Sequence, residues 1–341
     1  MRHVRVEDAV GHVLCHDITK IVPGEFKGRA FKKGHIIRPE DVPELLKLGK
    51  EHLYVWEYRE GILHEDEAAQ RIAAAAGRGG LTLTEPVEGK VNLQAAYRGL
   101  LKVDVTALTL VNSIDQVVLA TLHNNRVVES GQVVAGTRVI PIVIEEEKIR
   151  QVEAVCAGFG GIIEVKPFKT LRVGMVTTGN EVYHGRIKDR FGPVVRRKLE
   201  PFGSEVFRQV LVPDDAERIA AAIRELVTAG AEMVITTGGM SVDPDDVTPL
   251  GVRQAGAELV TYGAPVLPGS MYMIAYLGDI PVMGLPGCVM YAKTTIFDLV
   301  LPRVMAGERI IRSDLVGLGH GGICLECKAC HFPNCSFGKG C

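Results

Sequence analysis

The sequence predicts a multi-domain α/β protein, with a doubly wound, mostly parallel sheet preceded by a β-rich α+β amino-terminal region. Between residues 171 and 308, apolar strands alternate with helices. These strands are apolar along their whole length, as expected where helices cover both faces of a parallel sheet. Short β-branched runs and glycine turns dominate the earlier residues. The length of 341 residues also exceeds that of one ordinary domain.

The composition excludes several classes of protein. The chain is 47% hydrophobic and 23% charged, which is not typical of a disordered chain. Its net charge of −2 gives no electrostatic footprint for nucleic acid or an anionic membrane. No apolar run approaches the about 18 residues of a membrane-spanning helix, and the first residues lack a secretory signal. We therefore expect a cytoplasmic protein that binds neither nucleic acid nor membrane.

Two parts are predicted before the parallel sheet. Residues 1–58 form a small β-rich module with one helix over 39–49, which has acidic residues at its start. Residues 59–165 form a mixed α+β domain with helices over 64–77 and 145–158. β-branched runs, typical of strands, lie at 105–112, 117–122 and 138–144.

Residues 166–310 are predicted to form the α/β domain itself. Its clearest helix, 214–230, has a capping aspartate, apolar side chains on one face and a closing glycine. Sheets of this kind bind ligands outside the carboxyl ends of their strands. The other predicted elements are strands over 171–179, 204–212, 231–239 and 280–287, and helices over 193–203 and 289–305.

Three polar turns follow these strands, at 177–182, 236–246 and 284–289. Their small residues let a ligand approach the backbone, and their amides and hydroxyls suit a phosphate. The middle turn adds aspartates, which would repel a phosphate unless a cation such as Mg²⁺ lay between them. The pattern therefore indicates a magnesium-phosphate site. The alternative is a solvated turn whose aspartates cap the next helix.

The common nucleotide-binding signatures are absent: there is no G-x-x-x-x-G-K-[ST], and residues 158–163 fail G-x-G-x-x-G at the last position. Four other segments, 173–182, 187–203, 234–249 and 284–302, follow one another in the order and spacing of a known family. They resemble the molybdopterin-binding domain shared by molybdopterin adenylyltransferase and molybdopterin molybdotransferase. The earlier residues more faintly resemble the amino-terminal domains of the molybdotransferase.

The resemblance implies an enzyme of molybdenum cofactor biosynthesis. Such an enzyme would act on molybdopterin or adenylylated molybdopterin with Mg²⁺. Its partners would be a small pterin substrate and other cofactor-biosynthesis proteins or molybdoenzymes, and it would form a homo-oligomer. The resemblance assigns catalytic roles to Asp189 and Asp246, with Mg²⁺ at Asp246. The turns and the resemblance together assign ligand binding to Thr177, Thr178, Gly179, Glu181, Thr237, Gly238, Gly239, Ser241, Asp243, Pro286, Gly287 and Cys288.

The sequence departs from the family pattern in ways that favour other functions. Leu267 and Ser270 stand where the molybdotransferase has lysines suited to attract molybdate. Cys288 replaces the usual polar residue of its turn, either as a sulfur ligand or as a small buried residue. A cysteine tail also stands in place of the family's carboxy-terminal barrel. A non-catalytic carrier or sensor of the cofactor is therefore a second hypothesis, and a nucleotide pyrophosphatase a third.

The tail, residues 317–341, is predicted to bind a metal. Its cysteines Cys324, Cys327, Cys330 and Cys335 run C-x₂-C-x₂-C-x₄-C, with His331 beside them. A zinc site fits this spacing. The opening also matches a ferredoxin-type iron–sulfur run, although the x₄ step departs from it. The tail has too few apolar residues to build its own core, and metal binding would supply the missing folding energy. Free redox-active thiols are the alternative.

Overall fold

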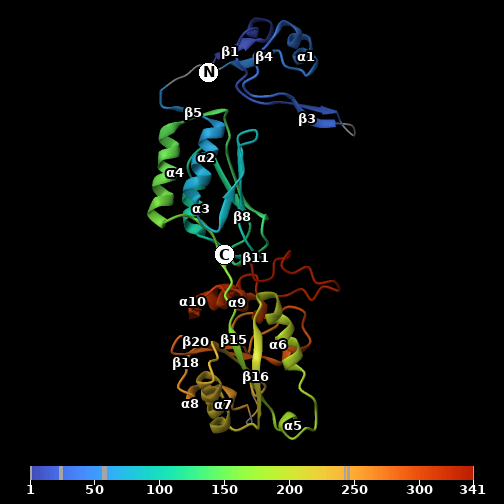
Figure 1. Cartoon of the computed structure of the whole chain (residues 1–341), viewed down its shortest axis with the longest axis vertical. Helices are drawn as coiled ribbons and strands as arrows, with labels where there is room; N and C mark the ends of the chain where they lie inside the picture. The colour runs from blue at the N-terminus through green and yellow to red at the C-terminus, as the bar shows by residue number, and fades with distance from the viewer. Residues whose placement is uncertain (1, 23–25, 56–59, 242, 244–245, 341) are drawn as a thin grey trace. The chain divides into compact units, whose positions relative to one another are not determined.

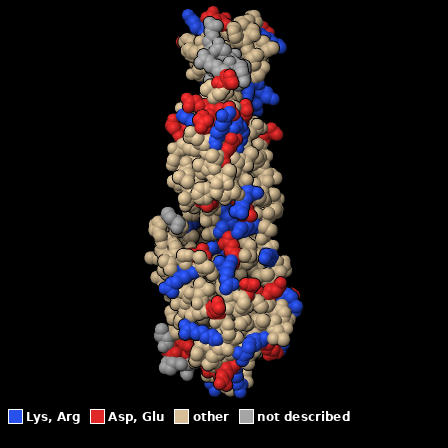
Figure 2. Space-filling model, turned by 90° about the vertical axis from the view of Figure 1, so that its left-hand side faces the viewer, with Lys and Arg blue, Asp and Glu red and all other residues tan. Residues whose placement is uncertain are grey.

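A computed structural model describes residues 2–22, 26–55, 60–241, 243 and 246–340. Two compact units are present (Figure 1). Unit 1 comprises 1–97, 102–122 and 128–165, and unit 2 comprises 98–101, 123–127 and 166–341. Positive and negative side chains are interspersed on the face drawn in Figure 2. No helix among the described residues has the length and apolar character needed to span a bilayer.

Unit 1 begins with a small β-rich core. Strand β1 pairs antiparallel with β4, and β2 pairs antiparallel with β3. Val6, Leu14, Ile18 and Leu53 are buried together between these strands and α1. The helix predicted over 39–49 is confirmed. The elements are β1 (Arg2–Arg5), η1 (Val6–Ala9), β2 (Ile18–Val22), β3 (Phe26–Phe31), η2 (Pro39–Asp41), α1 (Val42–Lys47) and β4 (His52–Val55).

The remainder of unit 1 is mixed α+β. An antiparallel sheet has the strand order β10-β12-β8-β7, and α2 packs against β12 and β8. Helices α2 and α4 lie side by side (Figure 1) and confirm both predicted helices. The elements between residues 62 and 167, of which 98–101, 123–127 and 166–167 belong to unit 2, are β5 (Ile62–His64), α2 (Glu65–Ala76), β6 (Gly77–Gly79), β7 (Leu81–Leu83), β8 (Lys90–Ala95), β9 (Gly99–Val103), α3 (Val105–Asn112), β10 (Val117–Thr121), β11 (Arg126–Val128), β12 (Val133–Val139), β13 (Val143–Glu145), α4 (Glu146–Phe159) and β14 (Ile163–Pro167).

One predicted strand is wrong, because residues 105–112 form helix α3. The Asp104 carboxylate accepts a hydrogen bond from the backbone N–H of Ala107 at 2.9 Å and so caps the helix. At the other end, the Asn112 side chain bonds both backbone groups of Leu119. These contacts outweigh the strand preference of the β-branched residues. The predicted strand over 138–144 is divided between β12 and β13.

Unit 2 contains a six-stranded sheet in the order β16-β15-β17-β20-β19-β18. The four strands β16, β15, β17 and β20 run parallel, and β19 and β18 extend the sheet antiparallel. The predicted fold class is thus confirmed. The strands are β15 (Arg172–Thr178), β16 (Glu205–Val212), β17 (Met233–Thr237), β18 (Glu258–Tyr262), β19 (Met273–Leu277) and β20 (Ile280–Leu285).

Helices cover both faces of this sheet. In β15, Met175 packs into the core that holds α6 and α9, and its neighbour Val176 packs into the core that holds α7 and α8. This alternation follows from the period of two in a strand. The helices are α5 (Asn180–Tyr183), α6 (Phe191–Leu199), η3 (Glu200–Phe202), α7 (Ala216–Thr228), α8 (Thr248–Gln254), η4 (Gly287–Met290), α9 (Ile296–Met305), α10 (Arg312–Val316) and η5 (Gly317–Gly319).

The helix predicted over 289–305 begins later than expected, at Ile296. Thr295 and Asp298 form a capping box, in which the Thr295 hydroxyl accepts from the N–H of Phe297 and Asp298 accepts from the N–H of Thr295. Polar capping therefore outweighs the apolar pattern that suggested a longer helix. The residues before Thr295 form η4 and an irregular segment instead.

Within unit 2, the cysteine tail packs against the core that holds α9. Phe337 is only 3% exposed there, and Phe332 and Cys335 lie against the same core. Gly338 has φ +72°, and a Cβ there would lie 2.3 Å from Cδ2 of Leu299, so a larger residue would strain the backbone and displace the Leu299 side chain. Beyond η5, the described tail residues form neither helix nor strand.

Candidate functional site

A pocket of about 730 Å³ lies at the carboxyl ends of β17 and β20. We call it the glycine-turn pocket. Its walls come from the turn after β17, the turn after β20, the loop 267–271 and the tail. It therefore lies where parallel sheets place their ligands. Of the predicted ligand-binding and catalytic residues, those lining it are Gly238, Gly239, Ser241, Asp246, Pro286, Gly287 and Cys288.

The turn after β17 requires glycine. Gly238 has φ +86°, and a Cβ there would lie 2.3 Å from the carbonyl oxygen of Thr178. The Thr248 hydroxyl donates to the carbonyl of Gly238 at 2.9 Å and lies 3.2 Å from the Thr178 hydroxyl. The neighbouring strand β15 and helix α8 thus fix the path of the turn. Thr178 supports the pocket from behind and does not line it.

Asp246 lines the pocket and shapes the acidic part of the same turn. Its carboxylate accepts from the backbone N–H of Asp243 at 2.9 Å. The Tyr262 hydroxyl holds the turn from β18, because it donates to the carbonyls of Met240 at 2.9 Å and Ser241 at 3.1 Å. Burial, and then the charge of Asp246, raise the pKa of Tyr262. Of the predicted acidic turn, Asp245 lies outside the described residues.

Asp189 holds the start of α6. Its carboxylate accepts from the N–H groups of Phe191 at 2.8 Å and Gly192 at 3.0 Å. The Gln209 side chain donates to the same carboxylate at 2.7 Å and to the Thr177 hydroxyl at 3.0 Å. Phe191 in turn lines the glycine-turn pocket, whereas Asp189 does not. Asp189 therefore positions the start of α6, and its catalytic role stays a prediction.

The other residues predicted to bind the ligand do not line the pocket. The hydroxyls of Thr177 and Thr237 are buried and lie 3.2 Å apart between β15 and β17. Gly179 leads into α5, which carries the exposed side chain of Glu181. Asp243 is exposed and its backbone pairs with Asp246. Their ligand-binding roles stay predictions.

The charge of the glycine-turn pocket is negative. Asp246 and Glu326 line it, and no lysine or arginine occurs among its described lining residues. Leu267, 55% exposed, and Ser270 occupy the loop where the sequence lacks the expected lysines. A phosphate in this pocket would be repelled unless a cation lay between it and the carboxylates.

The tail supplies one wall of the pocket, which sequence reasoning missed. Ile323 forms a parallel bridge with Leu267, and the N–H of Cys324 donates to the carbonyl of Leu267 at 2.8 Å. This pairing brings Cys324 and Glu326 into the same pocket as Cys288. Burial raises the pKa of the Cys288 thiol, which favours its neutral form. Nothing in the local sequence signals a pairing between segments so far apart.

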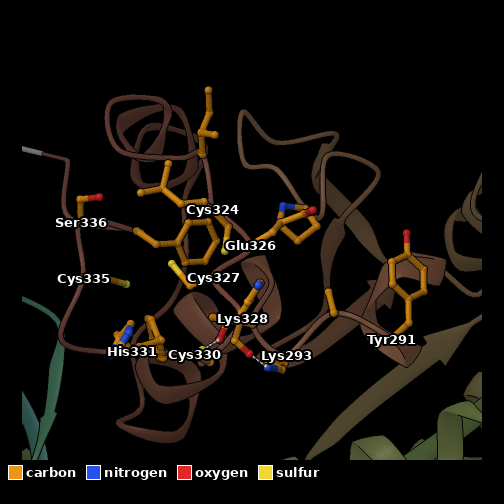
Figure 3. Close-up of a pocket in the computed structure, with 17 residues that line it drawn as sticks. Tyr291, Lys293, Cys324, Glu326, Cys327, Lys328, Cys330, His331, Cys335 and Ser336 are labelled. Atoms are coloured by element: carbon orange, nitrogen blue, oxygen red, sulfur yellow. Dashed lines mark hydrogen bonds between the residues drawn. The ribbon is translucent and has the colours of Figure 1, made fainter.

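The tail also encloses a second, mostly apolar pocket of about 420 Å³, which we call the cysteine pocket (Figure 3). Cys324, Cys327, Cys330, His331 and Cys335 line it together with aromatic and aliphatic side chains. The two pockets adjoin, since both are lined by Pro268, Tyr291, Ile323, Cys324 and Glu326.

The thiols of the cysteine pocket are free. The Thr294 hydroxyl lies 3.4 Å from the sulfur of Cys330. Hydrogen bonds from Thr294 and from the backbone of Phe332 hold the pKa of Cys330 below its usual range. Across the residues that the structure describes, no three His, Cys, Asp or Glu side chains form a group able to hold a metal ion. The four predicted cysteine ligands thus share one cavity, whereas Asp246 lines the glycine-turn pocket.

Comparison with known proteins finds a family match for the α/β domain. Residues 174–306 match the sequence family described as "Probable molybdopterin binding domain". We refer to the residues that match this family as the molybdopterin-binding domain. Residues 3–57 match a family described only as a domain of unknown function.

Relatives of the molybdopterin-binding domain carry different names. The chain is 25% identical over 185 residues to a molybdopterin molybdenumtransferase of Synechococcus elongatus, covering 51% of this chain and 46% of that protein. It is 40% identical over 90 residues to a CinA-like protein of Citrifermentans bemidjiense, covering 26% and 22%. It is 24% identical over 151 residues to a molybdopterin adenylyltransferase of Pyrococcus furiosus, covering 43% and 88%. The chain thus spans less than half the length of the first two relatives.

Some expectations from the sequence remain predictions. They are the cytoplasmic location, self-association, the protein partners and the division into four parts at 1–58, 59–165, 166–310 and 317–341. The structure describes two units, and within unit 2 the tail packs on the molybdopterin-binding domain.

Proposed function

We propose that the glycine-turn pocket binds molybdopterin or adenylylated molybdopterin, and that the protein acts in molybdenum cofactor biosynthesis as a molybdotransferase-type enzyme. One observation carries the proposal. In a molybdopterin-binding domain, the glycine turn and Asp246 line one pocket at the carboxyl ends of β17 and β20. The domain's relatives include proteins named for transfer reactions of molybdopterin.

The residues present fit a bound Mg²⁺. Carboxylate oxygens are the donors that Mg²⁺ prefers, and the pocket offers those of Asp246 and Glu326. When bound, Mg²⁺ would neutralise charge that develops on phosphate oxygens during adenylyl transfer or release. Asp246 would hold the ion, and the turn of Gly238 and Gly239 would let the phosphate approach the backbone.

The second candidate function is a non-catalytic carrier or sensor of the cofactor. The observation that favours it is the absence of lysine and arginine among the described lining residues. Molybdate is an anion, and Leu267 and Ser270 offer it no positive charge. A pocket of this kind can retain a Mg²⁺-bound pterin while failing to attract the metal oxyanion.

One anaerobic experiment separates the two candidates. The full chain is incubated with adenylylated molybdopterin, Mg²⁺ and molybdate, and AMP release and pterin retention are measured in the same sample. AMP release that Asp246→Asn abolishes supports the enzyme. Tight pterin retention without AMP release supports the carrier. If neither AMP release nor pterin retention is observed, the proposal is wrong and the domain has kept this fold for a different function.

Asp279→Asn is the matched control for Asp246→Asn. Asp279 is fully exposed in the hairpin between β19 and β20, away from the carboxyl end of β20. The control makes the same change in charge within the same unit. AMP release should therefore be unchanged in this variant. If both variants lose AMP release equally, the loss comes from the change in net charge, and a role for Asp246 at the pocket is contradicted.

A further inference from the structure

We propose that the cysteine pocket is the binding site of an iron–sulfur cluster held by Cys324, Cys327, Cys330 and Cys335. The inference goes beyond the proposed function, because it concerns a different pocket and does not depend on a pterin. The four cysteines come from one short tail, yet the fold places all of them around a single cavity (Figure 3).

The size of the cavity favours a cluster over a single ion. Zinc binds thiolates at about 2.3 Å, so four thiolates on one ion lie within about 4 Å of one another. The cavity that the four cysteines line has a volume of about 420 Å³, against the about 10–15 Å³ that is enough to hold one water. A cluster of several iron and sulfur atoms fills more of such a space than one ion does.

The surroundings of the cavity suit a cluster. Phe332 and Phe337 line it and make part of its wall apolar, while Cys327 and Cys330 are exposed. The Thr294 hydroxyl stands 3.4 Å from the sulfur of Cys330, as hydrogen bonds to ligand sulfurs do in iron–sulfur proteins. Lys293 and Lys328 also line the cavity, and their positive charges offset the negative charge of a thiolate-ligated cluster.

The backbone of the tail is arranged around the cavity from both ends. Before the cysteines, the bridge between Ile323 and Leu267 fixes the segment that carries Cys324. In the middle, the Lys293 ammonium donates to the carbonyl of Lys328 at 2.8 Å. After the cysteines, Phe337 is buried against the core of the domain. The cavity therefore belongs to the folded domain, and Cys324 places its ligand in the wall shared with the glycine-turn pocket.

The test uses the full chain purified without oxygen, and the metal-free chain incubated with Fe³⁺ and sulfide in the presence of a reducing thiol, which supplies the electrons for any Fe²⁺ in the cluster. We expect about two or about four iron atoms per chain with an equal amount of acid-labile sulfide. We also expect a broad visible absorption that dithionite bleaches. Stoichiometric zinc without sulfide, iron without sulfide, or no bound metal would each overturn the proposal.

Two variants keep the test specific. Cys327 and Cys330 have exposed side chains, so Cys327→Ser and Cys330→Ser leave the apolar core intact and should lose most of the iron and sulfide. Cys156→Ala is the control, because Cys156 is buried in α4 of unit 1 and lies outside the pocket. It removes one thiol and should retain the full cluster. Equal iron in all three variants would contradict the assigned ligands. Failure to bind pterin would leave this result unaffected.

Discussion

The glycine-turn pocket and the cysteine pocket share a wall but are built in different ways. The first lies at strand ends, where buried threonines of β15 and α8 fix the backbone of the turn. The second is enclosed largely by a tail whose described residues after η5 form neither helix nor strand. Its position depends on a few side chains, above all Phe337.

This difference indicates how each pocket responds to change. A substitution in the glycine turn would overlap with atoms of the sheet, so it should lower the free energy of unfolding of the whole domain. A substitution in the tail contacts affects a local opening of the tail, while the sheet remains folded. Substitutions at the glycine-turn pocket should therefore change the free energy of unfolding. Substitutions at the cysteine pocket should change the free energy of local opening of the tail.

The largest expected effect is that of Gly238→Ala. The new Cβ would lie 2.3 Å from the carbonyl oxygen of Thr178, at a φ of +86° that alanine disfavours. Strain and overlap together should lower the free energy of unfolding of unit 2 by about 4 kcal/mol. Urea unfolding, followed by a probe in unit 2, measures it.

Gly278→Ala is the control for this substitution. Gly278 also has a positive φ, +61°, but a Cβ there meets nothing within 4 Å. Its cost should be limited to the backbone conformation, about 1 kcal/mol. If the two substitutions cost the same, the close approach to Thr178 does not constrain the glycine turn.

Phe337→Ala should have the next largest effect, confined to the tail. Removing this buried ring costs about 3 kcal/mol of tail docking. Proteolytic cleavage at Lys328 or Lys339 should then accelerate by about 100-fold, because cleavage follows the population of the open tail. The urea midpoint of unit 2 should change far less. Unchanged cleavage would mean that other contacts hold the tail.

The sequence predicts the fold best where its signals are local and agree with one another. The helix over 214–230 has a capping aspartate, an apolar face and a terminal glycine, and α7 lies within it. Residues 105–112 mislead, because their β-branched composition favours a strand while Asp104 caps a helix. A single cap is a weak signal beside composition until the contacts of Asn112 are known.

The candidate site is predictable only in part, for a similar reason. The turns after β17 and β20 meet because parallel strands end at one edge, so Gly238, Asp246 and Gly287 share a pocket as expected. The contribution of Cys324 depends on a pairing of Ile323 with Leu267 that no local pattern signals. The hydrogen bonds of Asp189 to the start of α6 likewise emerge only from the fold.

Tyr262→Phe should loosen the glycine turn without unfolding the domain. The variant loses the hydroxyl that donates to the carbonyls of Met240 and Ser241. A hydrogen bond of this kind contributes about 1 kcal/mol, so hydrogen exchange of the turn amides should accelerate about fivefold. Tyr97→Phe removes a bond to Val165 in unit 1 and should leave the turn unchanged. Equal exchange in Tyr262→Phe and the wild type would contradict the role of Tyr262.

The smallest expected effect concerns the chemistry of the cysteine pocket. In the metal-free chain, hydrogen bonds from Thr294 and the backbone of Phe332 favour the thiolate of Cys330 and lower its pKa. Thr294→Val keeps the shape of the side chain but removes the hydroxyl 3.4 Å from the sulfur. The pKa of Cys330 should therefore rise, and its alkylation by iodoacetamide should slow at neutral pH, because the thiolate is the nucleophile.

Rates measured across pH by peptide mass spectrometry test this, with alkylation of Cys327 in the same sample as the internal reference. The pH midpoint for Cys330 should move upward in Thr294→Val. An unchanged midpoint would show that the thiolate is favoured without Thr294, by the backbone of Phe332 and the charge of Lys293. The segment before α9 would then act on Cys330 through charge and not through the Thr294 hydroxyl.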